Sequence, residues 1–172
     1  MKAVRNEYAK IGIENYYLKH SKDYSNPHRE IIKKLLNIAE QKNLIGKKVL
    51  DLACGSGEVT SVLLNYDHEI TGLDPYTADL YREKTSNKVI KLSFKDLVLG
   101  KLSEKFDTII CSFALHLCDK SMLPDLLWKL SEISDTLIVI TPHKRPDCDM
   151  ISSWVLVDEI LTDRVRMRIY FK

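Results

Sequence analysis

Apolar and polar positions follow two different patterns along the chain between residues 47 and 141. Short uninterrupted apolar runs, typical of strands buried on both faces, alternate with stretches whose apolar residues recur at helical spacing. Strands that alternate with helices form right-handed βαβ units, so the pattern predicts a mostly parallel sheet with helices on both faces. The predicted strands span residues 48–52, 68–73, 88–92, 107–112 and 136–141, and the predicted helices span 58–65, 76–84 and 123–133.

The two ends of the chain do not continue this alternation. Residues 154–160 and 164–171 are β-rich and joined by a short turn, which predicts an antiparallel hairpin that closes the sheet. Residues 1–45 favour helix, with Asn26 as an N-cap and Pro27 in the first helical turn. We therefore expect an α/β fold: a doubly wound, mostly parallel seven-stranded sheet with a C-terminal antiparallel hairpin and an N-terminal helical extension.

Composition narrows the class of protein without identifying a partner. The 172 residues suit one domain, and a formal net charge of +2 is too small to predict binding to nucleic acid or to an anionic membrane. No apolar stretch approaches the roughly 20 residues that span a bilayer, and the polar start lacks the apolar core of a signal peptide. The four cysteines have no metal-ligand spacing, which predicts reduced thiols, no metal site and a cytoplasmic location. They are Cys54, Cys111, Cys118 and Cys148.

Candidate ligand-binding residues lie where the first predicted strand turns into the first helix, in the segment VLDLACGSG at residues 49–57. In an open parallel sheet the carboxyl ends of the strands form the ligand crevice, and Gly55 and Gly57 let the backbone approach a ligand closely. A dinucleotide fingerprint needs a third glycine where Thr60 stands, and a P-loop needs a lysine after the last glycine. The loop therefore suits a ligand without a pyrophosphate.

An acidic residue, Asp74, follows the second strand. A carboxylate about 20 residues beyond the glycines can accept hydrogen bonds from both hydroxyls of a ribose. The alternative is that Asp74 only caps the helix that follows it.

These features resemble the class I S-adenosylmethionine-dependent methyltransferases over about residues 44–172, which implies one methyltransferase domain over 1–172 with a Rossmann-like core at 46–172 and a possible lid at 1–45. VLDLACGSG is similar to the family's first motif, VLDLGCGTG. The resemblance implies S-adenosylmethionine as the cofactor, with the methionine end at the first motif, the ribose at Asp74 and the adenine near Asp96. The cofactor-binding residues implied in this way are Asp51, Ala53, Cys54, Gly55, Ser56, Gly57, Asp74, Pro75, Tyr76, Asp96, Leu97, Cys111, Ser112 and Phe113.

Two departures from the family pattern bear on the expected chemistry. Ala53 stands where the first motif usually has a glycine, which narrows the freedom of the backbone at that point. The fourth motif, at residues 111–116, lacks the N-P-P-Y or D-P-P-Y of enzymes that methylate amino groups of DNA bases or protein glutamine. Those acceptors are therefore disfavoured.

Candidate acceptor-side residues come from three parts of the chain. His116 is either a general base or a packing histidine within the apolar run FALHL. Tyr16, Tyr17 and His28 either line a lid that contacts the substrate or only dock the extension on the sheet. His143, with Lys144 and Arg145 beside it, either meets an anionic substrate or lies in a solvated loop.

The last predicted strand carries alternating arginines, Arg164, Arg166 and Arg168, which places all three on one face. That face is a phosphate track for RNA, a protein-docking surface or simply a solvated face. The preferred hypothesis is a methyltransferase that acts on a small molecule. The alternatives are a tRNA or rRNA methyltransferase that uses the arginine face, and a non-catalytic partner subunit with the same fold.

Overall fold

The computed structural model describes residues 28–146, 148 and 153–172. Tyr16 and Tyr17, the N-cap at Asn26, Pro27 and most of the predicted lid lie outside the described residues, so those predictions stay predictions.

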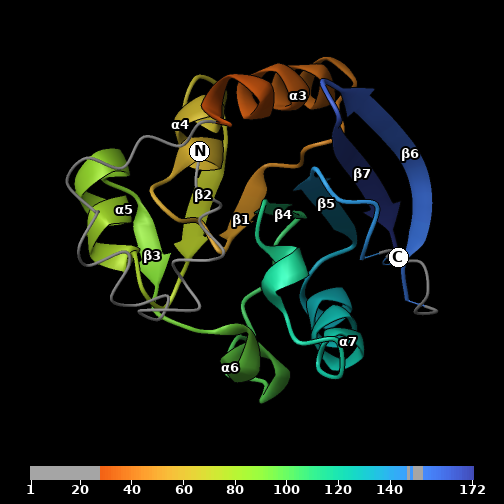
Figure 1. Ribbon diagram of the computed structural model, residues 1–172. Coiled ribbons are helices and arrows are strands. Elements are labelled where there is room, and N and C mark those ends of the chain that lie inside the picture. Colours follow the sequence, from red (N-terminus) through yellow and green to blue (C-terminus); the bar gives the residue numbers. More distant parts are fainter. Residues whose placement is uncertain (1–27, 147, 149–152) are drawn as a thin grey trace, which may run out of the picture.

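Seven strands form one sheet in the order β3-β2-β1-β4-β5-β7-β6 (Figure 1). The first five strands pair in parallel, while β7 pairs antiparallel with both β5 and β6, which confirms the predicted fold. The strands are β1 (Lys48–Leu52), β2 (Glu69–Leu73), β3 (Lys88–Ile90), β4 (Thr108–Ser112), β5 (Thr136–Thr141), β6 (Val155–Thr162) and β7 (Val165–Phe171).

Helices cover both faces of the sheet. Successive side chains of a strand point to opposite faces, so Val49 packs with α3 and α4 while Leu50 packs with α6 and α7. In Figure 1, α3, α4 and α5 lie on one side of the sheet, and α6 and α7 lie on the other. The helices are α3 (Arg29–Gln41), α4 (Glu58–Leu63), α5 (Ala78–Thr85), α6 (Phe94–Val98) and α7 (Leu123–Ile133), with a 3₁₀ turn, η1, at Leu115–Leu117.

The exposed basic face expected along the last strand is wrong. The Arg168 residue is only 6% exposed, and its guanidinium donates to Glu159 Oε2 at 2.6 Å and to the carbonyl oxygens of Lys144 at 2.9 Å and Pro146 at 3.2 Å. Arg166 also pairs with Glu159, at 3.6 Å, and Arg164 lies in the hairpin turn with φ 65°. The described residues Lys144 and Pro146, after β5, lie beside this face, and Arg168 donates to the carbonyl oxygens of both.

Candidate functional site

The turn between β1 and α4 has an unusual backbone. Three residues adopt left-handed conformations: Ala53 (φ 57°), Gly55 (φ 55°) and Gly57 (φ 88°). A left-handed alanine costs on the order of 1–2 kcal/mol, so Ala53 is held against its own preference. A Cβ built on Gly55 would meet nothing closer than Glu58 Oε2 at 3.8 Å, so the turn is open at Gly55 and a ligand can approach its backbone there.

Asp51, at the end of β1, is a buried carboxyl beneath this turn. The residue is 1% exposed, and its Oδ2 accepts hydrogen bonds from Thr60 Oγ1 at 2.7 Å and from Thr60 N at 3.3 Å. Burial raises the pKa of Asp51 to about 7, with smaller upward contributions from Glu58 and Asp74, while the Thr60 hydrogen bonds lower it. Among the described residues, the groups with the largest influence on this pKa are Thr60, Glu58 and Asp74, none of which is a cation. A buried carboxylate with that environment suits a cationic ligand.

Asp74, after β2, accepts hydrogen bonds from the backbone of two turns. Its Oδ1 accepts hydrogen bonds from Tyr76 N at 2.8 Å and Thr77 N at 3.0 Å, and Oδ2 accepts one from Gly55 N at 3.3 Å. Thr77 is the N-cap of α5, so Asp74 orders the turn before the helix and joins that turn to the β1–α4 turn. Pro75 and Tyr76 lie in the same turn, with Tyr76 47% exposed.

Asp96 lies in a helix that periodicity did not predict, because the five residues of α6 are too few to show a period. Its Oδ2 accepts hydrogen bonds from Ser93 N at 2.9 Å and Ser93 Oγ at 2.6 Å, and its Oδ1 pairs with Lys101 Nζ at 2.6 Å. The hydrogen bond from Lys101, followed by those from Ser93, holds the pKa of Asp96 well below its usual range. The Ser-x-x-Asp spacing is a capping-box signal that the sequence does contain. Leu97 packs in the core.

Three histidines predicted from separate parts of the chain form two ring pairs with residues that follow β4 and β5. The His28 ring stacks on Phe113 with centroids 4.2 Å apart and an interplanar angle of 9°. The His116 and His143 rings lie 4.6 Å apart at 59°. Phe113 has φ 55°, which is strained for a bulky residue, and Ser112 Oγ is buried without a hydrogen-bond partner among the described residues.

Cys111, at the end of β4, is not suited to act as a nucleophile. Its side chain is fully buried, and burial raises the pKa of its thiol above the ordinary range. A reactive cysteine needs an accessible thiolate, so Cys111 is a small strand residue.

Comparison with known proteins identifies the family. Residues 49–134, half of the chain, match the family model described as a methyltransferase domain. The chain belongs to the class I S-adenosylmethionine-dependent methyltransferases. S-adenosylmethionine is accordingly its methyl donor.

Individual relatives of this methyltransferase differ in what they act on. An uncharacterised protein of Schizosaccharomyces pombe is 28% identical over 197 aligned positions, which cover 88% of this chain and 79% of that protein. A tRNA U34 carboxymethyltransferase of Campylobacter concisus is 36% identical over 80 residues, 43% of this chain and 28% of that enzyme. A crystal structure of magnesium protoporphyrin IX methyltransferase from Synechocystis with bound S-adenosylmethionine superposes with a TM-score of 0.71 at 16% identity, covering 98% and 95% of the two chains.

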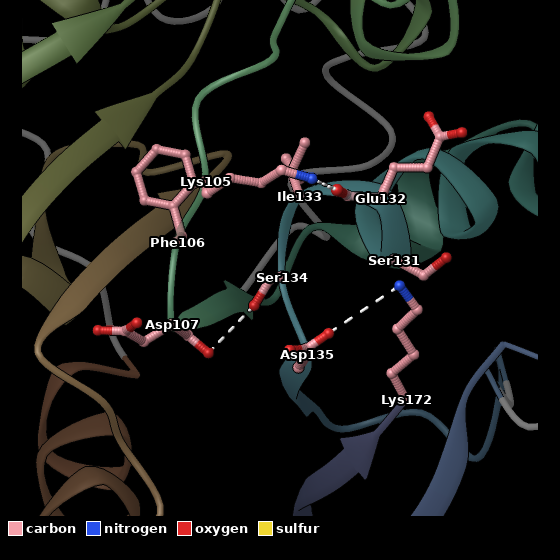
Figure 2. A pocket seen from close by; sticks show the side chains of 9 residues that line it. All are labelled: Lys105, Phe106, Asp107, Ser131, Glu132, Ile133, Ser134, Asp135 and Lys172. Atoms are coloured by element: carbon pink, nitrogen blue, oxygen red, sulfur yellow. Dashed lines mark hydrogen bonds and ion pairs between the residues drawn. The ribbon is translucent and has the colours of Figure 1, made fainter.

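A hollow of the methyltransferase lies at the opposite edge of the sheet, beside the amino ends of β4 and β5 (Figure 2). Its polar groups bond to one another: Lys105 Nζ donates to the carbonyl oxygen of Glu132, Ser134 Oγ donates to Asp107 O at 3.1 Å, and Lys172 pairs with Asp135 at 4.0 Å. We therefore place the functional site at the carboxyl edge.

Two negative findings concern the described part of the methyltransferase. Its His, Cys, Asp and Glu side chains form no group of three or more that could hold a metal ion. None of its helices is both long and apolar enough to cross a membrane.

Proposed function

We propose that this methyltransferase transfers the methyl group of S-adenosylmethionine to a small molecule that carries an acidic group. The observation that carries the proposal is the presence of two ring pairs beyond β4 and β5, His28 on Phe113 and His116 beside His143. Basic residues flank these rings in the chain, with Arg29 after His28, and Lys144 and Arg145 after His143. Imidazole and cationic side chains favour an anionic or acidic acceptor over a protonated amine.

Features of the β1–α4 edge support the cofactor-binding half of the proposal. Gly55 lies at an open turn, Asp51 is a buried carboxyl, and Thr77 Oγ1 and Ser112 Oγ are buried hydroxyls without a hydrogen-bond partner among the described residues. Unsatisfied polar groups of this kind are costly unless a ligand pairs with them. Ser112 ends β4 and Thr77 follows β2, on either side of β1, so a ligand that lies across the turn can reach both.

In the proposed site the backbone at Ala53–Gly57 and the Asp51 carboxylate hold the methionine end of the cofactor, while Asp74 Oδ2 accepts from the ribose hydroxyls. We leave Asp96 out of this site, because the Lys101 ammonium pairs with its Oδ1 at 2.6 Å, whereas among the described residues Asp74 accepts only from backbone N–H groups.

On the acceptor side, the proposed chemistry depends on the imidazole of His116 and on how the attacking atom is aligned with the methyl group. When bound, S-adenosylmethionine supplies a methyl group on a positively charged sulfur, and its transfer depends mostly on alignment of the attacking atom. Neutral His116 takes the proton of the attacking acidic group as that group loses it. The exposed His143 ring beside it gives that proton a route to water. The stacked pair of His28 and Phe113 holds the start of α3 at the same edge.

RNA is the weaker of the two acceptor classes. The arginine face that favoured RNA is largely absent, because Arg168 is buried and Glu159 pairs with both Arg166 and Arg168.

The acceptor class can be tested with tritium-labelled S-adenosylmethionine, incubated with the protein and either a metabolite filtrate or total RNA of the same cells. We expect label to enter the filtrate, and we expect prior passage of that filtrate over an anion-exchange resin to remove the acceptor. An excess of S-adenosylhomocysteine, the spent cofactor, serves as the control for enzymatic labelling. Label in RNA alone would contradict the small-molecule proposal, and labelling that survives the resin would contradict an acidic acceptor.

Replacing Asp74 separates its two roles. Asp74→Asn keeps an oxygen for Tyr76 N–H and Thr77 N–H but places an NH₂ group in the position of Oδ2, which faces Gly55 N. We expect thermal stability to fall by no more than roughly 4 °C, since one hydrogen bond is worth about 1 kcal/mol. Affinity for S-adenosylmethionine should fall about 10- to 100-fold in calorimetry, as for loss of a charged hydrogen-bond acceptor. Asp74→Ala, the control, should also lose about 1 kcal/mol from the turn before α5. Full cofactor affinity in Asp74→Asn would remove Asp74 from the ribose site.

A further inference from the structure

Tyr81 belongs to α5, yet its hydroxyl is part of a buried hydrogen-bonded chain that reaches the end of β1. The Tyr81 side chain is fully buried, and its hydroxyl lies 2.8 Å from Thr60 Oγ1, which in turn lies 2.7 Å from Asp51 Oδ2. We propose that Tyr81 is a positioning residue for the cofactor, because through Thr60 it holds the Asp51 carboxylate ionised and oriented toward the cationic part of S-adenosylmethionine. This inference rests on the proposed function of Asp51.

The direction of the chain of hydrogen bonds follows from the number of protons available. A threonine hydroxyl has one proton to donate and two lone pairs to accept. When Asp51 is ionised it can only accept, so the Thr60 hydroxyl donates its proton to Asp51 Oδ2. Tyr81 must then be the donor to Thr60 Oγ1. Each hydrogen bond in such a chain polarises the next, so the Tyr81 hydroxyl strengthens the bond that Thr60 makes to the carboxylate.

The fold makes room for the Tyr81 ring at two glycines. A Cβ on Gly72, which is opposite Asp51 in the register of β1 and β2, would lie 2.5 Å from Tyr81 Cζ. A Cβ on Gly57 would lie 3.3 Å from Tyr81 Cδ2. The phenol therefore packs directly against the β1–α4 turn and against β2.

In the electrostatic surroundings of Asp51, the two hydrogen bonds to its Oδ2 are the interactions that favour the ionised carboxylate. Burial raises the pKa of Asp51, and Thr60 is the group that lowers it. Burial and the nearby Asp51 also raise the pKa of Tyr81 above its usual range, so the phenol keeps its proton and remains a donor. Among the described residues, the other ionisable groups with the largest influence on Asp51, or most influenced by it, carry no positive charge. These groups are Glu58 of α4, Asp74 after β2, Cys54 of the turn and Cys111 of β4.

The test measures the affinity for S-adenosylmethionine by calorimetry between pH 5.5 and 9, for the wild type and Tyr81→Phe. Wild-type affinity should rise with pH as Asp51 ionises. In Tyr81→Phe the midpoint of this rise should move upward by about half to one pH unit, so that binding is roughly 3- to 10-fold weaker at acidic pH and nearly unchanged at pH 9. A ¹³C NMR titration of the Asp51 carboxyl in the protein without cofactor should show the same upward shift.

Three further variants separate positioning from packing. Tyr66→Phe also loses a tyrosine hydroxyl, one that donates to Asn37 Oδ1 at 3.0 Å on the surface, and should leave the pH profile unchanged. Thr60→Ser keeps the relaying hydroxyl and should retain the wild-type midpoint, whereas Thr60→Val should shift it further than Tyr81→Phe. A loss of affinity in Tyr81→Phe that is equal at every pH, or an unshifted Asp51 titration, would overturn the inference alone. If the wild type binds no S-adenosylmethionine at any pH, the proposed function fails and the inference fails with it.

Discussion

Asp51→Asn is expected to stabilise the protein while it weakens cofactor binding. The Asp51 pKa is about 7 in the folded protein against an ordinary value of 3.8. Below pH 3.8 both the folded and the unfolded states are protonated, so Asp51 has no effect on stability. Between pH 3.8 and 7 the unfolded state binds fewer protons than the folded state, so the free energy of unfolding falls as pH rises. Above pH 7 the full penalty remains, on the order of 4 kcal/mol at 1.36 kcal/mol per pKa unit.

Chemical denaturation at pH 4 and pH 8 measures this linkage in the protein without cofactor. Asp51→Asn should match the wild type at pH 4 and exceed it by a few kcal/mol at pH 8, because asparagine does not ionise. Asp135→Asn removes a carboxylate whose side chain is 88% exposed and should show no such difference. A wild type as stable at pH 8 as Asp51→Asn would show that the buried carboxyl carries no penalty.

Cofactor affinity should move in the opposite direction in the same variant. Loss of a charged partner costs about 1.5–3 kcal/mol, so Asp51→Asn should bind S-adenosylmethionine roughly 10- to 150-fold more weakly at pH 8. The wild-type advantage should shrink toward pH 5, where Asp51 is itself protonated. Equal affinity of the two proteins at pH 8 would mean that Asp51 does not act on the cofactor. The paired outcome, higher stability with weaker binding, is what separates a ligand-binding carboxyl from a structural one.

Gly57→Ala is expected to destabilise the fold strongly. Its φ of 88° strains any residue with a side chain, and the added Cβ would lie 2.5 Å from Thr85 Cγ2. The backbone strain and the overpacking together should cost about 2–4 kcal/mol, which lowers the melting temperature of a chain this size by roughly 4–16 °C. Cofactor binding should be lost with it, because Gly57 ends the β1–α4 turn.

Two variants divide this cost into its parts. Gly100→Ala has a similar φ of 73° with nothing within 4 Å of the added Cβ, so it should cost about 1–2 kcal/mol from backbone strain alone. Gly57→Ala combined with Thr85→Ser lacks the Cγ2 methyl group and should recover most of the excess over Gly100→Ala. Thermal unfolding of the wild type, Gly57→Ala, Thr85→Ser and the combined variant forms a double-mutant cycle. Equal losses in Gly57→Ala and Gly100→Ala would show that the contact with Thr85 carries no cost.

Local patterns were sufficient to predict the strands of this protein. The apolar runs at 48–52 and 136–141 are β1 and β5 with the same bounds, because strands buried on both faces need no partner to be recognised. Helix α6 is too short to show a helical period, and only its capping box indicates it in the sequence. The last strand was predicted correctly, but its exposed arginine face was not. Alternation places side chains on a face without saying that Glu159 and the Lys144 carbonyl oxygen accept hydrogen bonds from Arg168 there.

The sequence by itself determined the fold class, the family and the positions of the acidic residues at the strand ends, since each depends on residues close together in the chain. Only the tertiary structure decided what those residues contact. His116 meets His143 because the carboxyl ends of the parallel strands β4 and β5 lie at one edge, and the start of α3 brings His28 onto Phe113. Tyr81 reaches Asp51 through Thr60 because two glycines leave space for its ring between three elements. Distances between residues 20 or 100 positions apart are set by packing, which no local pattern records.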